Sequence, residues 1–154
     1  MFFSSCETAR KINESDMEEL IIFINSFYDF LNNDPKPEDV YKYFFNNDIQ
    51  FYIINTSHYH RFISRNQSTQ AIEFIDIINE LYYKSKKMKE REIKRAVFVK
   101  QVYDVPMSDL FVLDYNVIYE DLEASETFFI KKADKTYKIY RFFINYNKDW
   151  GDAE

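Results

Sequence analysis

The sequence predicts an α+β fold in which three N-terminal helices pack in a curved antiparallel sheet. Two observations lead to this prediction. Apolar residues recur at helical spacing over much of the first half of the chain, and the second half holds four runs rich in β-branched and aromatic residues. Short polar or proline-bearing breaks separate these segments. Helices followed by strands are typical of the α+β class.

A first helix is expected to begin at Ser15, where Ser15 and Glu18 form an S-x-x-E capping box. Its apolar face consists of Leu20, Phe23, Ile24, Phe27 and Leu31. Pro35 prevents the helix from continuing, and Pro37 fits the first position of a short second helix, PEDVYKYFFNN. The residues of this second helix that can face a core are Val40, Tyr43 and Phe44.

A strand is predicted over IQFYIIN, residues 49–55, after a turn at Asp48, and a shorter strand around Tyr59 to Ser64. Ser68 or Thr69 can cap a third helix. Its apolar stripe consists of Ala71, Phe74, Ile75, Ile78, Leu81 and Tyr82. The four strand-like runs that follow are EIKRAVFVKQVYD, DLFVLDYNVIYED, ASETFFIKKA and KTYKIYRFFINYN. No repeat or linker interrupts the chain, so we expect one domain over residues 1–154 with an ordered core of about 15–147.

Two of these runs place apolar residues on both faces of the expected sheet. Val112 and Ile118 alternate with a strongly apolar set, and Ile139 and Phe143 lie opposite Phe142 and its neighbours. A face of this kind exposes more apolar area than a monomer usually tolerates. We therefore expect a homodimer whose second copy covers Val112, Ile118, Ile139 and Phe143.

Composition narrows the compartment and the class of partner. The formal net charge of −6 argues against a nucleic-acid-binding protein, since such proteins carry a basic excess. The lone Cys6 excludes an internal disulfide and favours the cytoplasm. The N-terminus MFFSSCETARK lacks a basic segment before its apolar residues, and no run approaches the ~20 apolar residues that span a membrane, so neither export nor membrane insertion is expected.

The order of helices and strands resembles that of the nuclear transport factor 2-like, or cystatin-like cone, superfamily. The segments that carry the resemblance are FINSFYDFLN, PEDVYKYFFNNDIQFYI, STQAIEFIDIINELYY and the closing strands. The resemblance implies a curved sheet wrapped around the helices, with a pocket at the open end of the cone. The superfamily includes ketosteroid isomerase, scytalone dehydratase, polyketide cyclases and many non-enzymatic modules, so the fold leaves the function open.

One residue type tests the isomerase chemistry that the resemblance implies. Ketosteroid isomerase carries a general-base aspartate on the strand that follows the second helix. Residues 49–54 of this chain, IQFYII, hold no carboxylate. We therefore predict no catalytic residue from the resemblance.

The H-x-H pair His58 and His60 could bind a metal ion if Tyr59 lies in a strand, but the sequence supplies no third ligand. A histidine could also act in proton transfer with Asp104, Asp109 or Asp114. The alternative, which we favour, makes the histidines contacts at the rim of the cone and the aspartates surface groups. With a single glycine, Gly151, the chain holds no glycine-rich phosphate loop, and it shows no cofactor motif. We predict neither a metal site nor a cofactor.

A basic run, KSKKMKEREIKR, follows the third helix. It is a candidate interaction surface through Lys84, Lys86, Lys87, Lys89 and Arg91. The alternative is a solvated charged connection near the negative end of the helix dipole.

Two functions follow from these features. The first is a non-enzymatic, cytosolic protein-interaction module that forms a homodimer, of which an immunity or inhibitor protein would be a special case. The second is a cone that binds or converts a small molecule, with Tyr28, Tyr52, His58, His60 and Tyr115 as pocket or rim residues. A cone interior that is filled by phenylalanine and isoleucine side chains favours the first function.

Overall fold

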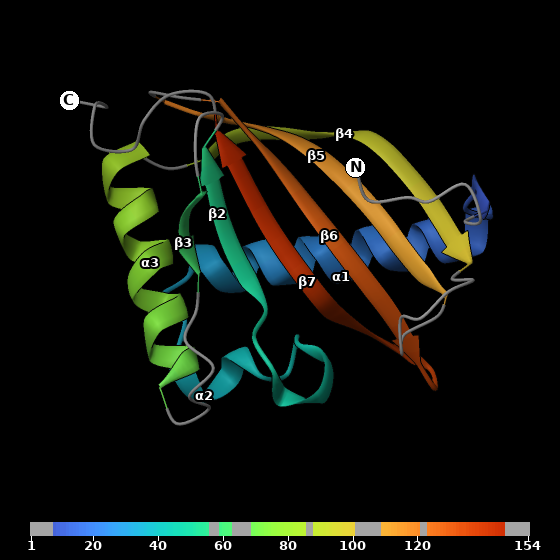
Figure 1. Ribbon diagram of the computed structural model, residues 1–154, viewed down its shortest axis with the longest axis horizontal. Coiled ribbons are helices and arrows are strands. Elements are labelled where there is room, and N and C mark those ends of the chain that lie inside the picture. The colour runs from blue at the N-terminus through green and yellow to red at the C-terminus, as the bar shows by residue number, and fades with distance from the viewer. Residues whose placement is uncertain are drawn as a thin grey trace.

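One sheet and the helices that pack against it make up the described part of the chain, which in this computed structural model comprises residues 8–55, 59–62, 69–85, 88–100, 109–120 and 123–146 (Figure 1). The helices are α1 (Glu14–Asn32), α2 (Pro37–Val40), the 3-10 helix η1 (Phe45–Asn47) and α3 (Gln70–Ser85). The strands are β1 (Thr8–Lys11), β2 (Phe51–Asn55), β3 (Tyr59–Phe62), β4 (Met88–Lys100), β5 (Leu110–Tyr119), β6 (Glu123–Ala133) and β7 (Thr136–Tyr146). The predicted order of helices and strands is confirmed, with β1 as an unexpected addition.

The sheet has the strand order β1-β4-β5-β6-β7-β2-β3. The four long strands β4 to β7 are antiparallel, as predicted, and of all neighbouring pairs in the described sheet β2 and β7 alone run parallel. The long helix α1 crosses one face of the sheet, and α3 lies beside β2 and β3 (Figure 1). We call the face that α1 covers the inner face and the opposite one the outer face.

Helix α1 begins one residue earlier than the sequence pattern suggests. Asn13 is its N-cap: the Asn13 Oδ1 accepts from the Asp16 backbone N–H at 2.8 Å, and the Asn13 amide donates to the Asp16 carboxylate at 3.0 Å. The capping box of Ser15 and Glu18 is therefore not formed, because the reciprocal pair two residues earlier takes its place. The apolar stripe of α1 is buried as expected, apart from the half-buried Phe23, and Tyr28 joins it.

Helix α2 is much shorter than predicted, although Pro37 does stand at its beginning. The chain leaves the helix after Val40 and lies against β7, where the Ile139 N–H donates to the Tyr43 carbonyl at 2.7 Å. Gln70, at the start of α3, ties the next segment down: its side chain accepts from the Ile49 N–H at 3.2 Å and donates to Asp48 at 3.1 Å. These bonds fix the entry into β2.

A β-bulge changes which residues of β7 face the core. Phe129 of β6 pairs with Arg141, whereas its neighbour Ile130 pairs with Ile139, so Tyr140 is an extra residue in the strand. The alternation is therefore reset, and Tyr137 and Ile139 lie on the same inner face as Phe142. The prediction that Ile139 belongs to the outer, dimer-forming face is wrong for this reason, since Ile139 is completely buried in the core.

Candidate functional site

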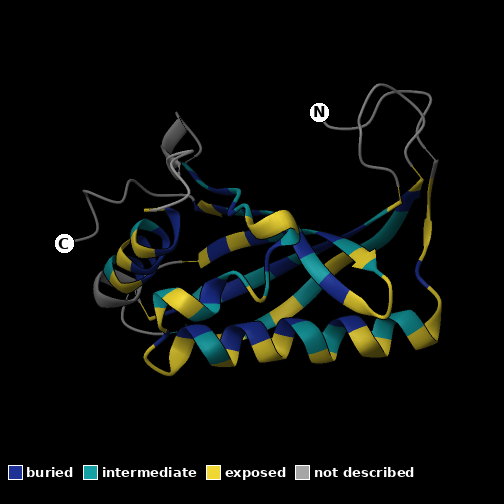
Figure 2. Cartoon of the chain, turned by 90° about the horizontal axis from the view of Figure 1, so that it is seen from below, coloured by how far each residue is buried: buried dark blue, intermediate teal, exposed yellow. Residues whose placement is uncertain are grey.

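Aromatic rings fill the space between α1 and the inner face of the sheet. Phe27 of α1 is completely buried, and its ring lies 5.9 Å from Phe128 and 5.7 Å from Phe142. Phe44, in the segment between α2 and η1, and Phe74 of α3 also pack against Phe27. Buried residues recur along α1 and along the strands that it crosses (Figure 2). Within the described residues, the middle of the cone is thus packed as a protein core and not hollow.

A carboxylate, Glu126 of β6, lies inside this core with 1% of its surface exposed. Tyr28 of α1 donates a hydrogen bond to Glu126 Oε1 at 2.7 Å, and Tyr119 of β5 donates to Oε2 at 2.5 Å. Both carboxylate oxygens therefore have a partner, as a buried charged group requires. Burial raises the pKa of Glu126, and the two tyrosine hydrogen bonds and the positive charge of Arg91 oppose that increase.

Glu126 was not among the residues that we selected from the sequence, although a signal for it exists. Ala124, Phe128 and Ile130 occupy alternate positions of β6 and are buried, and Glu126 shares their face. A carboxylate at an apolar position of an alternating strand is a buried charge and needs a partner.

Arg91 connects this buried network to the protein surface. Its guanidinium carbon lies 4.3 Å from the centre of the Tyr28 ring, and Nη2 donates to Asn25 Oδ1 at 2.5 Å. Nη1 approaches the Met88 sulfur at 3.5 Å. Arg91, expected in a basic surface, therefore points towards α1, since the bulges in β4 at Met88/Glu90 and Ile93/Arg95 reset its alternation.

A hollow of about 400 Å³ lies where α1 crosses the first half of β4. It is lined by Ile21, Asn25, Glu90, Arg91, Glu92, Ile93 and Tyr115. Tyr115 is only 4% exposed, and its hydroxyl has no hydrogen-bond partner in the part of the chain that the structure describes. Burial raises the pKa of Tyr115 to about 12, with Arg91 acting in the opposite direction.

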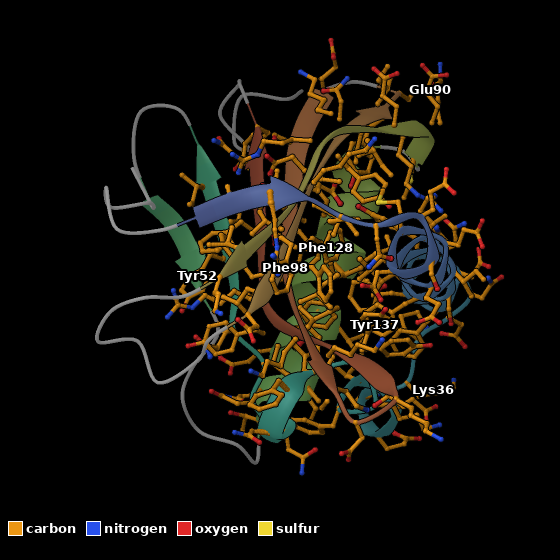
Figure 3. The ribbon with its side chains drawn as sticks, turned by 90° about the vertical axis from the view of Figure 1, so that its right-hand side faces the viewer. Lys36, Tyr52, Glu90, Phe98, Phe128 and Tyr137 are labelled. Carbon is orange, nitrogen blue, oxygen red and sulfur yellow. The ribbon has the colours of Figure 1, made fainter. Side chains whose placement is uncertain are left out.

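The predicted pocket residues thus separate into two groups. Tyr28 and Tyr115 lie close together on the inner face, with ring centres 6.0 Å apart. Tyr52 lies on the outer face, where its ring stacks on Phe143 at 4.9 Å; Figure 3 shows it on the far side of the sheet from α1. His58 lies outside the described residues, and for His60 the structure describes the backbone in β3 but not the side chain.

The outer face combines apolar and charged side chains. Phe129 and Phe143 have ring centres 5.7 Å apart and are half-buried, as is Ile118. Val112 is also on this face but is completely buried, between its partners Val97 and Phe129. Val112 therefore contributes little surface to an interface, although we expected it to be part of the dimer face.

The candidate acid–base and basic residues lie apart from one another. Asp114 is an outer-face group that accepts from Arg95 at 3.0 Å and from Thr127 at 2.6 Å. Asp109 is exposed, and Asp104 lies outside the described residues.

Of the lysines in the basic run, Lys89 is exposed, Lys86 and Lys87 are outside the described residues, and Lys84 is described in its backbone only. The second half of the basic run forms the beginning of β4. The alternative prediction of a solvated charged connection is therefore wrong from Met88 onward.

Within the described ranges, no group of three or more histidine, cysteine, aspartate or glutamate side chains is placed to hold a metal ion. None of the described helices combines the length and apolar character needed to cross a bilayer.

No family model and no curated protein matches this sequence. Solved structures do. A nuclear transport factor 2-like protein of unknown function from Shewanella baltica superposes with a TM-score of 0.58 at 7% identity, covering 91% of this chain and 100% of that one. A second from Silicibacter pomeroyi gives 0.58 at 9% identity, covering 89% and 100%.

A cystatin-like fold protein of unknown function from Nostoc punctiforme gives a TM-score of 0.55 at 11% identity and covers 91% of this chain and 97% of that one. At these identities the likeness shows the fold and no more. The chain has the nuclear transport factor 2-like, cystatin-like α+β fold, as its order of helices and strands predicts.

Proposed function

We propose that this chain is a cytosolic, non-enzymatic interaction module that assembles as a homodimer through the outer face of its sheet. The observation that carries the proposal is the packed interior. The central carboxylate, Glu126, is 1% exposed and bonded through both oxygens, so it has no contact with a substrate. An acid or base must come within hydrogen-bond distance of the proton that it transfers.

The outer face supports a second copy as its partner. It carries half-buried aromatic side chains, Tyr52, Phe129 and Phe143, at the centre of several strands. It also carries both signs of charge, with Arg95 beside Asp114. A two-fold interface brings the same patch of both copies together, and a patch with both signs of charge can be complementary to itself.

The size of the face is also adequate. Four strands of ten or more residues, β4 to β7, form most of it. Strand spacing and rise give an area on the order of 600 Å². A standard interface uses about 800 Å² of each partner, so the side chains of β2 bring the face close to that size.

Sedimentation velocity at tens of micromolar protein tests the assembly. We expect the full chain to sediment as a dimer and Phe143→Lys to sediment as a monomer with unchanged far-UV circular dichroism, because a buried lysine at a two-fold interface meets its own copy. Ile22→Lys is the matched control, since Ile22 lies on α1 and is 69% exposed. A monomeric wild-type chain, or a Phe143→Lys variant that remains dimeric, would contradict the proposal.

A further inference from the structure

The edge of β4 that faces away from β5 is only partly covered by another strand. β1 pairs with four of the 13 residues of β4, from Val97 to Lys100, and β4 otherwise forms the margin of the long strands (Figure 1). From Met88 to Ala96, no strand in the described part of the chain pairs with this edge, and none of these residues is buried. In an edge strand every second residue points its N–H and C=O away from its one partner. This edge therefore offers unpaired main-chain groups.

The hollow between α1 and β4 opens onto this edge. Glu90, Arg91, Glu92 and Ile93 are consecutive, and all four line it. Their register with β5 turns Arg91 and Ile93 towards α1 and turns Glu90 and Glu92 towards the outer face. A hollow lined by residues of both faces reaches the edge of the strand and therefore its main chain. An extended polypeptide fits such a site, because an added strand pairs with the N–H and C=O groups of a sheet edge.

The α1 side of the hollow is apolar at one position of β4 and positive two residues away. Ile21 of α1 and Ile93 are half-buried and line it together. Arg91 donates to Asn25 at 2.5 Å and approaches the Met88 sulfur at 3.5 Å, and within the described ranges no carboxylate forms an ion pair with it. On an added strand, a side chain opposite Ile93 would meet apolar surface and one opposite Arg91 would meet a positive charge.

The outer side of the same stretch is negative. Glu90 and Glu92 are exposed, and their pairing partners on β5 are uncharged. Two exposed lysines, Lys89 and Lys94, stand at the bulges that bound this stretch. Charges and bulges of this kind prevent an edge from pairing with arbitrary strands. A strand with complementary charges avoids that repulsion, so the same groups can select a partner.

We propose that Glu90–Ile93 binds an extended segment of a partner protein as an added antiparallel strand, with the local sequence aliphatic–basic–acidic. The aliphatic side chain lies opposite Ile93 and contacts Ile21, the basic one lies opposite Glu92, and the acidic one lies opposite Arg91. Antiparallel pairing sets this order; β1 already pairs in that way on the same edge. The proposal names a class of partner for the interaction module, but it stands independently of the homodimer, which uses the outer face.

Hydrogen exchange of the full chain, followed by NMR, tests this proposal with a synthetic peptide. The probe is threonine–threonine–valine–lysine–glutamate–threonine–threonine with acetylated and amidated ends, and its matched control exchanges the lysine and the glutamate. At millimolar concentration we expect the probe to slow the exchange of alternate amides between Met88 and Ala96 by about tenfold. We expect it to bind about fivefold more tightly than the control, because opposite charges then lie in paired positions.

Three results would overturn the proposal. The first is slow exchange of all these amides in the free chain, since the edge would then already be paired. The second is equal binding of probe and control, and the third is a probe that shifts signals without slowing exchange, which would be an electrostatic contact only. Protection that appears without peptide as the protein concentration rises would assign the edge to a second copy of the chain instead.

Substitutions then assign the two sides of the added strand. Glu92→Lys places like charges opposite each other and should weaken probe binding about fivefold. Its matched control is Glu123→Lys, since Glu123 is exposed but lies on β6. Ile21→Lys should weaken binding by a similar factor, whereas Ile22→Lys leaves it unchanged, because Ile22 is 69% exposed and does not line the hollow. Equal losses in the control variants would overturn the assignment, and sedimentation of each variant reports separately on the dimer.

Discussion

Glu126 and Asp114 are carboxylates on adjacent strands of one sheet, but they lie on opposite faces and have different surroundings. Glu126 on the inner face receives hydrogen bonds from two tyrosine hydroxyls and is almost completely buried. Asp114 on the outer face forms a half-buried ion pair with Arg95 and accepts from Thr127. Because water can replace the partners of Asp114 but cannot reach those of Glu126, we expect the inner network to contribute far more to stability.

The largest expected effect comes from removing each carboxylate in turn. Glu126→Ala leaves two buried tyrosine hydroxyls without an acceptor and opens a cavity, so we expect a loss of about 3–5 kcal/mol in the free energy of unfolding. Asp114→Ala should cost about 1 kcal/mol, since its charge partner is exposed. Urea unfolding followed by far-UV circular dichroism measures both. Losses of similar size would show that the two faces do not differ in the way that their burial suggests.

The β-bulge in β7 allows the same comparison with apolar side chains. Ile139 is completely buried because the bulge turns it inward, whereas Ile118 is half-buried on the outer face. We expect Ile139→Ala to lower the free energy of unfolding by about 2–4 kcal/mol and Ile118→Ala by about 1 kcal/mol or less. The measurement is urea unfolding at low protein concentration, where a dimer contributes little. A larger loss of stability for Ile118→Ala than for Ile139→Ala would mean that the bulge does not turn Ile139 into the core.

The difference between the faces also explains what the sequence could predict. The stripes of α1 and α3 follow a local period, and so both helices and the order of the long strands were predicted. The bulge at Tyr140 has no such signal, because neither glycine nor proline marks it and it is set by pairing with Phe129 and Ile130 of β6. The same reason applies to Arg91, whose inward direction depends on bulges between β4 and β5.

Within the candidate site, Tyr28 and Tyr115 were identified from the sequence, and Glu126 was recognisable but missed. The capping residue of α1 was misplaced for a different reason. Two overlapping capping patterns, one from Asn13 and one from Ser15, compete for the same helix start, and local sequence does not rank them. The remaining errors concern the face of the sheet on which a residue lies. That face depends on bulges set by pairing with a neighbouring strand, and these errors therefore lie in β4 and β7.

The smallest expected effect is a pH dependence of stability that arises from the inner carboxylate, Glu126. Because burial raises the pKa of Glu126 above its ordinary value, the folded protein binds a proton at this site more readily than the unfolded chain does. The site's contribution to stability is therefore greatest below the ordinary glutamate pKa and declines as the pH rises through the folded value. Glu126→Gln removes the titrating group, so the stability of the wild type relative to this variant should increase when the pH is lowered from 7 to 5. Urea midpoints of both proteins at the two pH values give this difference, with Asp114→Asn as the outer-face control. A constant difference between wild type and Glu126→Gln would mean that the tyrosine hydrogen bonds and Arg91 compensate the burial of the carboxylate in full.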